Sequence, residues 1–572
     1  MFAFVLHNKS YLSNEIAKYS YKSLADTLFM CYSKDKTSNY ICQNDNISII
    51  SKGISQYTNN LNLSEQIFKL YNQNNSEICK YLDLEFSFLL FDKNNNKIIA
   101  ARDRFGVQAL YYFHSNDILI ISNQLKFIKE YLSLSRLDNS WVYSSLTGVV
   151  YDKTSSAIDK IRKLPPAHYL QFEDNKLEIK QYWKLEKNNL GKLSLNEYIS
   201  TFKDLLIQSV ENRMQNNIGS ELSGGLDSSA IVGIAANYTN NLYTYSHSLP
   251  KKLKNKFRPY NDESKFYNLV IRKHKIEQKH RNITCNNIGV FNLIKNELRI
   301  QGIPINNTLP YLSNELLLNA KQDNISTIFS GFGGDEGVSN QASFMMYNWA
   351  RNFNIYQLAK NKKNFIKHII KAYYKNNKLI KYNQDYFFLN KEFISNNKFE
   401  KKHIEHIYNH HYKTLSDFIY HKLNENYISN RMELFQQTAM YRGVNYSFPL
   451  LDYKLIEFYY SIPDKYKFYK AQKRYIFKEA IKDFVPKEIY LRNSKAGATV
   501  PNVLHRFMID YDLIYDYLQS SKNGKVTEYI DIEKMISKMA LIKQLYQGKK
   551  THANQHIFLN ALMIIVYLNE DY

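Results

Sequence analysis

Cysteine is scarce in this chain of 572 residues, which contains four, at positions 31, 42, 79 and 285. They form no Cys-x-x-Cys pair, so neither a disulfide framework nor a zinc ribbon is indicated, and a reducing cytoplasm is the expected compartment. Long apolar runs are also missing, because stretches such as ALMIIVYL are much shorter than the ~20 residues of a membrane helix. The first residues, MFAFVLHNKS, lack the basic segment of a signal peptide. We therefore expect a soluble cytoplasmic protein with no membrane partner.

Acidic residues are outnumbered, since 76 Lys and Arg against 53 Asp and Glu give a net charge of +23. Such an excess is found in nucleic-acid-binding proteins. Here it is spread along the whole chain together with abundant Asn, Ile and Tyr, which favours a lysine-rich proteome over a binding patch. No nucleic-acid partner is expected. The 48 Tyr and 33 Phe argue against disorder, and at ~150 residues per domain the length suggests two to four domains.

The hydrophobic pattern changes near residue 195. Before it, short apolar runs such as FSFLLFD (86–92) alternate with Asn- and Gly-bearing turns, which predicts a β-rich domain over 1–190. After it, longer helical periods alternate with strand-like runs, which predicts a parallel α/β sheet within a second domain, 195–572. The Lys-, Asn- and Tyr-rich stretch 351–430 is interpreted as helical surface structure that elaborates the second domain.

The motif SGGLDSS (223–229) lies between a strand-like run that ends at Leu222 and the apolar helix AIVGIAA. Its glycines let the backbone turn tightly and bring N–H groups close to a ligand. Its serines can donate further hydrogen bonds, and the positive end of the following helix faces the loop. No Gly-Lys-Ser/Thr follows, so this is no Walker A loop. The embedded Asp227 instead indicates a pyrophosphate held together with a metal ion.

A second glycine-rich turn, in STIFSGFGGDEGVS (326–339), again follows a strand-like run and contains Asp335 and Glu336. Two such turns at adjacent strand ends would bring Asp227 and Asp335 to one Mg²⁺ on a polyphosphate. Carboxylate oxygens and retained waters are the ligands that Mg²⁺ prefers.

These two turns resemble those of the asparagine synthetase family, which includes the β-lactam synthetases and the lasso-peptide macrocyclases. The resemblance covers nearly the whole chain. Further motifs fall in family order: ARDRFGVQALYY (101–112), LPPAHYL (164–170), NDESKFYNLV (261–270), RMELFQQTAMYRGVNYSFPLLDYKLIEFYYSIP (431–463) and KAGATVP (495–501). The family resemblance implies an N-terminal amidotransferase-like domain with an Ntn-type αββα sandwich. The second domain would then be a parallel-sheet α/β ATP-pyrophosphatase domain, similar to the adenine nucleotide α-hydrolases, with helical additions.

The family reaction implies ATP and Mg²⁺ as cofactors, because a carboxylate is transferred to AMP with release of pyrophosphate before an amine displaces the AMP. The resemblance also implies roles for individual residues. The pyrophosphate cradle would be Ser223, Gly224, Gly225, Asp227, Ser228 and Ser229, the AMP contacts Leu222, Ser246 and Gly331, and the metal ligands Asp227 and Asp335. Lys495 matches the lysine that neutralises charge at the acyl-adenylate, a role in which a fixed cation is strongly stabilising. Arg492 is displaced by one position from the usual R-x-K-x-G spacing and is left out of the catalytic set.

The first domain departs from the family at its glutaminase site. Asparagine synthetases use an N-terminal cysteine, whereas the second residue here is Phe2, and Cys31 and Cys42 are internal. The glutamine-binding Asn-Gly-Glu turn is reduced to Lys52-Gly53-Ile54, while Asp103 survives in a stretch that also packs the fold. We interpret this domain as an inactive glutaminase retained as a scaffold.

The second domain departs from the family at Phe332, where asparagine synthetases carry Glu and β-lactam synthetases Tyr. Because Phe cannot deprotonate an amine, Glu433 in RMELF is the candidate base, with a helix-surface role as the alternative. The spacing of His406 and His410 suits a metal on a helix, but an exposed helical face is the favoured interpretation.

The favoured hypothesis is a lasso-cyclase-like ligase that closes a precursor peptide with the peptide's own amine; a leader protease is a candidate partner. An asparagine synthetase running on ammonia, a catalytically silent binding protein and a tRNA-modifying pyrophosphatase remain as alternatives.

Overall fold

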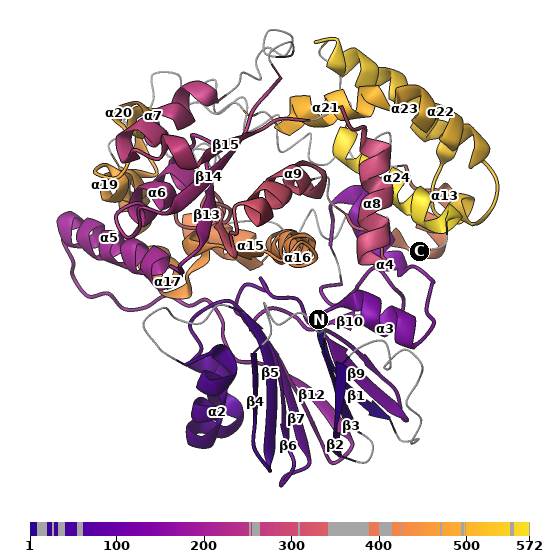
Figure 1. The fold of residues 1–572 in the computed structure, drawn as a ribbon, viewed down its shortest axis with the longest axis horizontal. Helices are drawn as coiled ribbons and strands as arrows, with labels where there is room; N and C mark the ends of the chain where they lie inside the picture. The colour runs from indigo at the N-terminus through magenta and orange to yellow at the C-terminus, as the bar shows by residue number, and fades with distance from the viewer. Residues whose placement is uncertain are drawn as a thin grey trace.

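The computed structural model places an all-antiparallel β unit below an α/β unit (Figure 1). The residues described by the structure are 1–7, 20–25, 28–32, 40–53, 61–150, 152–250, 253, 263–285, 287–306, 309–340, 388–399, 414–424, 426–469, 472–492, 497, 499–549, 554–570 and 572.

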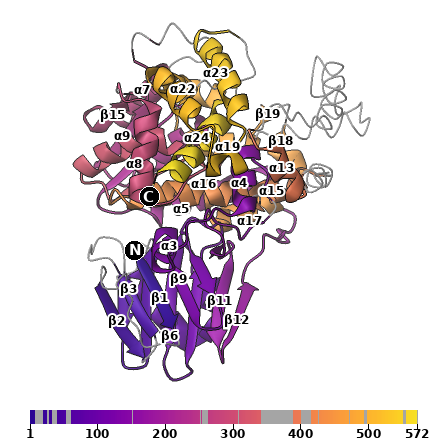
Figure 2. The same ribbon diagram turned by 90° about the vertical axis from the view of Figure 1, so that its right-hand side faces the viewer.

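The N-terminal unit contains, among the described residues, two six-stranded sheets with the orders β10-β8-β9-β1-β3-β2 and β12-β11-β7-β6-β5-β4. Figure 1 shows the two sheets side by side, and Figure 2 looks onto the face of the first. The strands are β1 (Phe2–His7), β2 (Ser20–Ala25), β3 (Leu28–Tyr32), β4 (Tyr40–Gln43), β5 (Ile47–Gly53), β6 (Phe86–Asp92), β7 (Lys97–Arg102), β8 (Tyr111–His114), β9 (Ile118–Ser122), β10 (Arg162–Lys163), β11 (His168–Glu173) and β12 (Lys176–Gln181). Helix α2 (Leu63–Asn74) covers the second sheet, and α3 (Leu125–Tyr131) and α4 (Asn139–Thr147) cover the first.

Strand β6 shows why the apolar runs of this unit are continuous. Phe88 and Leu90 pack towards α2, whereas Leu89 and Phe91 pack between the two sheets. Both faces of the strand are therefore buried, and no polar alternation is needed. The four layers are helix, sheet, sheet and helix, so the expected αββα sandwich is confirmed.

The α/β unit contains a five-stranded sheet, again counted among the described residues, with the order β15-β14-β13-β16-β17. All its strand pairs are parallel, as expected. Its strands are β13 (Ile218–Glu221), β14 (Leu242–His247), β15 (His280–Ile283), β16 (Thr327–Phe329) and β17 (Asn445–Ser447). Five helices are interspersed with them: α5 (Leu195–Glu211), α6 (Leu226–Ala235), α7 (Ser264–His274), α8 (Val290–Gln301) and α9 (Leu309–Gln322).

The order of these strands marks a switch point. From β13 the chain moves to β14 and β15 on one side, then returns to β16 on the other. In open α/β sheets, ligands bind beyond the carboxyl ends of the strands at such a point. The carboxyl ends of β13 and β16 are therefore the expected ligand site.

Further helices follow β16 and pack around both units. They are α13 (Lys391–Asn396), α15 (Leu415–Asn424), α16 (Asn426–Met440), α17 (Tyr453–Ser461), α18 (Asp464–Lys467), α19 (Tyr475–Ile481), α20 (Lys487–Leu491), α21 (Thr499–Ile509), α22 (Tyr511–Ser520), α23 (Ile532–Tyr546) and α24 (Gln555–Asn569), with a short hairpin of β18 (Phe468–Tyr469) and β19 (Gln472–Lys473). Helix α24 packs against α4, so the outer layer of the sandwich is shared with the C-terminal helices.

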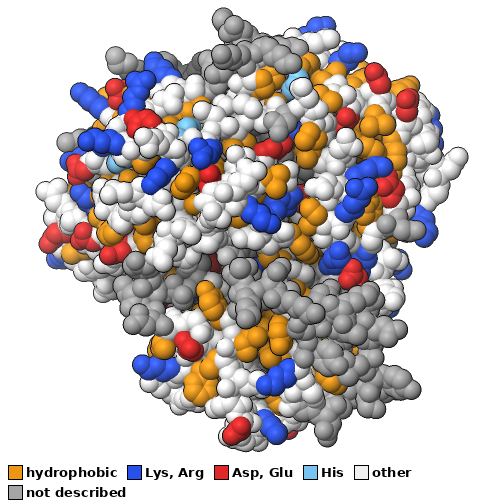
Figure 3. Space-filling model, viewed as in Figure 1, with side chains coloured by type: hydrophobic (Ala, Val, Ile, Leu, Met, Phe, Trp, Pro, Cys, Tyr) orange, Lys and Arg blue, Asp and Glu red, His pale blue; other side chains and the backbone are white. Residues whose placement is uncertain are grey.

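The helical surface structure expected over 351–430 is described in part, as α13, α15 and the start of α16. His406 and His410 lie outside the described residues. Within the described ranges, no helix has both the length and the apolar character needed to cross a bilayer. On the face shown in Figure 3, Lys and Arg side chains are dispersed among Asp and Glu.

Candidate active site

The SGGLDSS motif forms the turn between β13 and α6, at the switch point. The backbone N–H of Leu222 donates to Tyr245 O at 2.8 Å, and the Ser246 hydroxyl donates to Leu222 O, so the ends of β13 and β14 are tied together. Gly224 has φ +72°, and a Cβ there would lie 2.9 Å from the backbone N of Tyr267. The turn therefore passes directly over the start of α7, where only glycine fits.

The second glycine-rich turn, which follows β16, interlocks with the first. A Cβ on Gly331 would lie 2.8 Å from the backbone N of Ser228, and one on Gly334 would lie 2.8 Å from Asp227 Oδ1. Both glycines thus allow the second turn to touch the first turn of α6. The two motifs that the sequence singled out meet at one place.

Donors suited to an anion gather at the start of α6. Gly225 precedes the helix and has no side chain to cap its first N–H groups. The Ser223 backbone N–H donates to Ser228 Oγ at 3.1 Å, and the two serine hydroxyls are 3.0 Å apart. Ser229 is fully buried in the same turn. Backbone N–H groups, hydroxyls and a helix N-terminus together form the kind of cradle that binds phosphate.

The two predicted metal ligands share one cation, Arg474, which precedes α19. Its Nη1 lies 3.7 Å from Asp227 Oδ2, and its Nη2 donates to Asp335 Oδ1. Asp227 and Asp335 are thus close enough to hold a single charge. No three His, Cys, Asp or Glu side chains come together as a metal cage within the described part of the chain. Two carboxylates beside a phosphate cradle nevertheless fit Mg²⁺, which is usually bound by one or two carboxylates plus substrate phosphates.

Arg492 contacts the first turn directly, although the sequence analysis left it out of the catalytic set. Its Nη1 donates to Gly224 O at 3.1 Å and its Nη2 to Glu263 Oε1 at 2.7 Å, while the guanidinium stacks 3.7 Å from the Phe266 ring. The displaced R-x-K-x-G spacing was the feature of the sequence that could have pointed to Arg492. Arg474 was missed entirely, although the basic run before a helix in KRYIFKE offered a weak signal. Lys495 lies outside the described residues, so its role stays a prediction.

Phe332 lies in the second turn together with Glu336, and Glu221 is hydrogen-bonded to Ser330 of the same turn. The Arg431 guanidinium lies 4.3 Å from the Phe332 ring. Glu221, the last residue of β13, accepts hydrogen bonds from the Ser330 hydroxyl at 2.6 Å and the Tyr446 hydroxyl at 3.1 Å. Burial raises the pKa of Glu221, and it also raises the pKa of Glu336 in the second turn. Glu221 was not identified from the sequence, because a single acidic residue in a strand carries no pattern, and Glu336 was noted in the second turn without a role.

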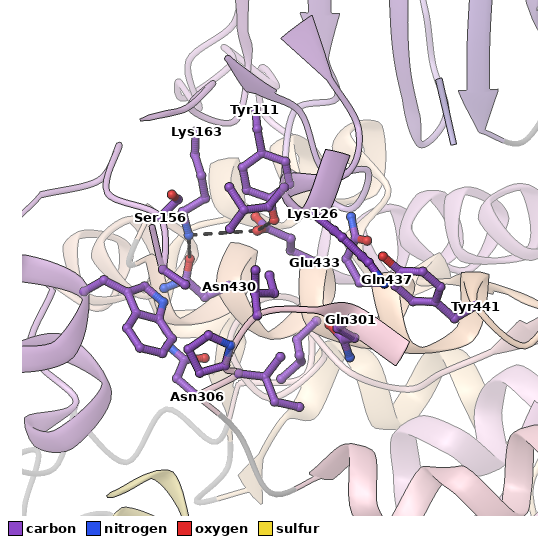
Figure 4. Close-up of a pocket in the computed structure, with 17 residues that line it drawn as sticks. Tyr111, Lys126, Ser156, Lys163, Gln301, Asn306, Asn430, Glu433, Gln437 and Tyr441 are labelled. Carbon is purple, nitrogen blue, oxygen red and sulfur yellow. Dashed lines mark hydrogen bonds and ion pairs between the residues drawn. The ribbon is translucent and has the colours of Figure 1, made fainter. Parts of the chain in front are cut away.

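Glu433 lies on a different side of α16. It follows Arg431 by two residues, about 200° around the helix, and lines a pocket of about 60 Å³ between the two units (Figure 4). Arg102 Nη2 donates to its carboxylate at 2.9 Å, the Tyr111 hydroxyl donates to it as well, and Lys163 Nζ lies 4.0 Å away.

This environment does not suit a general base. Burial alone would raise the pKa of Glu433, but the charges of Lys163 and Arg102 and the Tyr111 hydrogen bond outweigh it and lower the pKa. A carboxylate held by two cations accepts a proton poorly. The surroundings of Glu433 favour a role in joining the two units.

Residues 201–566 match the family model described as asparagine synthase, and residues 58–183 match that of a glutamine amidotransferase domain. A putative glutamine-hydrolyzing asparagine synthetase of Methanocaldococcus jannaschii is 29% identical over 227 residues, which are 38% of this chain and 42% of that protein. The amidase chry2 of Gibberella zeae is 31% identical over 180 residues, 30% of this chain and 26% of that protein. The solved U34-tRNA thiolase NcsA of Methanococcus maripaludis covers 65% of this chain and 91% of its own, at 12% identity and a TM-score of 0.21. The chain thus spans less than half the length of the two curated relatives.

Proposed function

We propose an activity for this chain from the premise that it belongs to the asparagine synthase family. It is an ATP-dependent ligase that transfers a carboxylate to AMP, releases pyrophosphate and then forms an amide with an amine. The observation that carries this proposal is the meeting of the two glycine-rich turns, which gathers a phosphate cradle and two carboxylates at the switch point of the sheet.

Each residue at these strand ends has a defined task in the proposed reaction. The N–H groups and hydroxyls of 223–229 bind the β- and γ-phosphates, and Leu222, Ser246 and Gly331 contact AMP at the strand ends. Mg²⁺ held by Asp227 and Asp335 would neutralise the phosphate charge. Lys495 stabilises the charge that develops where the amine attacks. Arg492 holds the first turn in place through Gly224 O.

The N-terminal unit, for which we propose the bounds 1–190, supplies no ammonia. The strand Phe2–His7 contains no Cys, Ser or Thr, and Phe2 is fully buried in the core between the sheets. Burial raises the pKa of Cys31 to about 12, so that thiol is no nucleophile at neutral pH. The amine therefore comes from a substrate of the adenylating unit, 195–572.

We further propose that this substrate is a precursor peptide, whose terminal amine attacks its own activated Asp or Glu side chain. Two features support this assignment: the absence of a glutaminase nucleophile on β1, and an apolar Phe332 stacked against Arg431 where a small polar substrate would need a hydrogen-bonding partner. Holding a folded peptide would convert a disfavoured ring closure into a positioned attack. The second candidate is an ammonia-using asparagine synthetase, which the name of the Methanocaldococcus relative favours.

ATP–pyrophosphate exchange separates the two candidates. We expect exchange, and loss of one water from the peptide mass, with a peptide that has a free terminal amine and an internal Asp or Glu, and no exchange with L-aspartate. Asp227→Asn should abolish both, Lys495→Ala should abolish amide formation, and Cys31→Ala should leave both unchanged. Exchange with aspartate together with ammonia-dependent asparagine formation would establish the second candidate instead.

A further inference from the structure

The contact of Arg474 with the two metal carboxylates has a chemical consequence of its own. The guanidinium approaches both Asp227 and Asp335 through its two terminal nitrogens. Mg²⁺ binds carboxylate oxygens at about 2.0–2.1 Å. A metal ion bound between the same two carboxylates would lie beside the guanidinium, and the two positive charges would repel each other. Arg474 and the divalent cation are thus competitors for one position.

The backbone holds Arg474 in this position. Arg474 has φ +58°, a left-handed backbone conformation that is uncommon for any residue other than glycine. Its carbonyl accepts a hydrogen bond from the Lys478 N–H at 2.8 Å, where α19 begins. Its side chain is only 12% exposed. The start of a helix therefore aims a largely buried cation at the carboxylates.

Lys478 provides a comparison for Arg474. Lys478 follows Arg474 by one helical turn, on the same face of α19, and is 4% exposed. No carboxylate forms an ion pair with Lys478 among the residues that the structure describes. A bare divalent cation at Asp227 and Asp335 would therefore meet the Arg474 guanidinium, which is paired with both aspartates, and not Lys478. A metal that arrives with phosphates brings the negative charge that Arg474 attracts.

We propose that Arg474 is a positioning residue that competes with the divalent cation for Asp227 and Asp335, so that the protein binds Mg²⁺ tightly only together with a nucleotide. The inference rests on the proposed nucleotide site but not on the identity of the amide product. It couples metal uptake to nucleotide uptake, and the released guanidinium remains beside the bound phosphates.

Binding of Mn²⁺ to the full chain, measured by the loss of the free-ion electron paramagnetic resonance signal, tests this competition. Wild type should bind Mn²⁺ at least about tenfold more tightly with α,β-methylene-ATP than without it. Arg474→Gln should bind Mn²⁺ without nucleotide at least about tenfold more tightly than wild type, and Arg474→Lys should lie between them. Lys478→Gln is the matched control, because it removes the same charge but no contact with the aspartates; its affinity should change by less than about threefold.

Two results would overturn the competition. One is Arg474→Gln binding Mn²⁺ alone no more tightly than wild type, with circular dichroism showing that both Arg474 variants are folded. The other is an equal gain in Mn²⁺ affinity for Lys478→Gln, which would show that the effect comes from net positive charge and not from the Arg474 contacts. Failure of wild type to bind Mn²⁺ even with the analogue would instead count against the metal site of the proposed function, and the nucleotide-free comparison would still decide the role of Arg474.

Discussion

Replacing Lys52 by Met should stabilise the N-terminal unit. Lys52 lies on β5 opposite Ser87 of β6 and is 1% exposed. Its Nζ has no hydrogen-bond partner among the described residues. Burial lowers its pKa from 10.5 to about 7, because the charged ammonium is poorly solvated there. Methionine has a similar length and removes the polar atom, so the core keeps its volume.

The size of the gain depends on pH. At ~1.36 kcal/mol per pKa unit, a fall from 10.5 to about 7 corresponds to a cost on the order of 5 kcal/mol for folding with Lys52 protonated. The unfolded chain binds the proton more tightly, so wild-type stability rises as the pH rises from about 7 towards 10.5. This free-energy cost is fully present below the folded-state pKa of about 7 and disappears above the unfolded-state pKa of 10.5. Lys52→Met should therefore gain most at the acidic end.

Urea unfolding between about pH 6 and pH 10 measures this difference. Lys97→Met on β7 is the matched control, since Lys97 is also buried in the second sheet but lies 3.7 Å from Glu173. The free energy of unfolding of Lys97→Met should show no comparable gain over wild type at low pH. A Lys52→Met variant that is less stable than wild type throughout, or a difference that stays constant across the pH range, would refute the picture of a buried lysine without a partner.

Three further outcomes follow from the contacts. Glu433→Ala should cost about 3–5 kcal/mol in urea unfolding, because Arg102 is left buried without its counter-charge; a large fall in turnover at unchanged stability would restore Glu433 as a base. Since the pKa of Glu433 is lowered, its contribution should be present above pH 4.5 and lost as the pH falls through its folded value. Gly331→Ala should impair ATP–pyrophosphate exchange with an unchanged circular dichroism spectrum, because a Cβ there would meet Ser228 N at 2.8 Å; normal exchange would show that the turns do not touch in solution. Glutamine should give no more product than ammonia in wild type, and a glutaminase activity lost in Cys31→Ala would contradict the scaffold interpretation.

Local patterns predicted much of the fold. The run FSFLLFD became β6 over Phe86–Asp92, because a strand buried on both faces is apolar throughout. Helix α5 begins at Leu195, where the hydrophobic pattern of the sequence changes, and it ends at Glu211. The turn chemistry of SGGLDSS predicted the first loop, although α6 already begins at Leu226, within the motif and before the apolar run AIVGIAA. In each case the deciding interactions lie within a few residues of one another.

The parts of the site that depend on distant contacts could not be predicted in this way. Arg474 reaches Asp227 and Asp335 from a helix start far along the chain, and Arg492 reaches Gly224 across 268 residues. Glu433 is paired with Arg102 across 331 residues, and nothing in RMELF indicates that partner. Such pairs follow from the packing of the two units rather than from any local spacing.

Buried ion pairs cross the boundary between the two units and hold them together. Glu433 of α16 depends on Arg102 of β7, and Arg213 after α5 is held by Glu85 of the sandwich and by Asp452. Either half produced alone would expose broken ion pairs at a surface that is normally dry. On the scaffold interpretation, the N-terminal unit would be retained because its loss would destabilise the second unit.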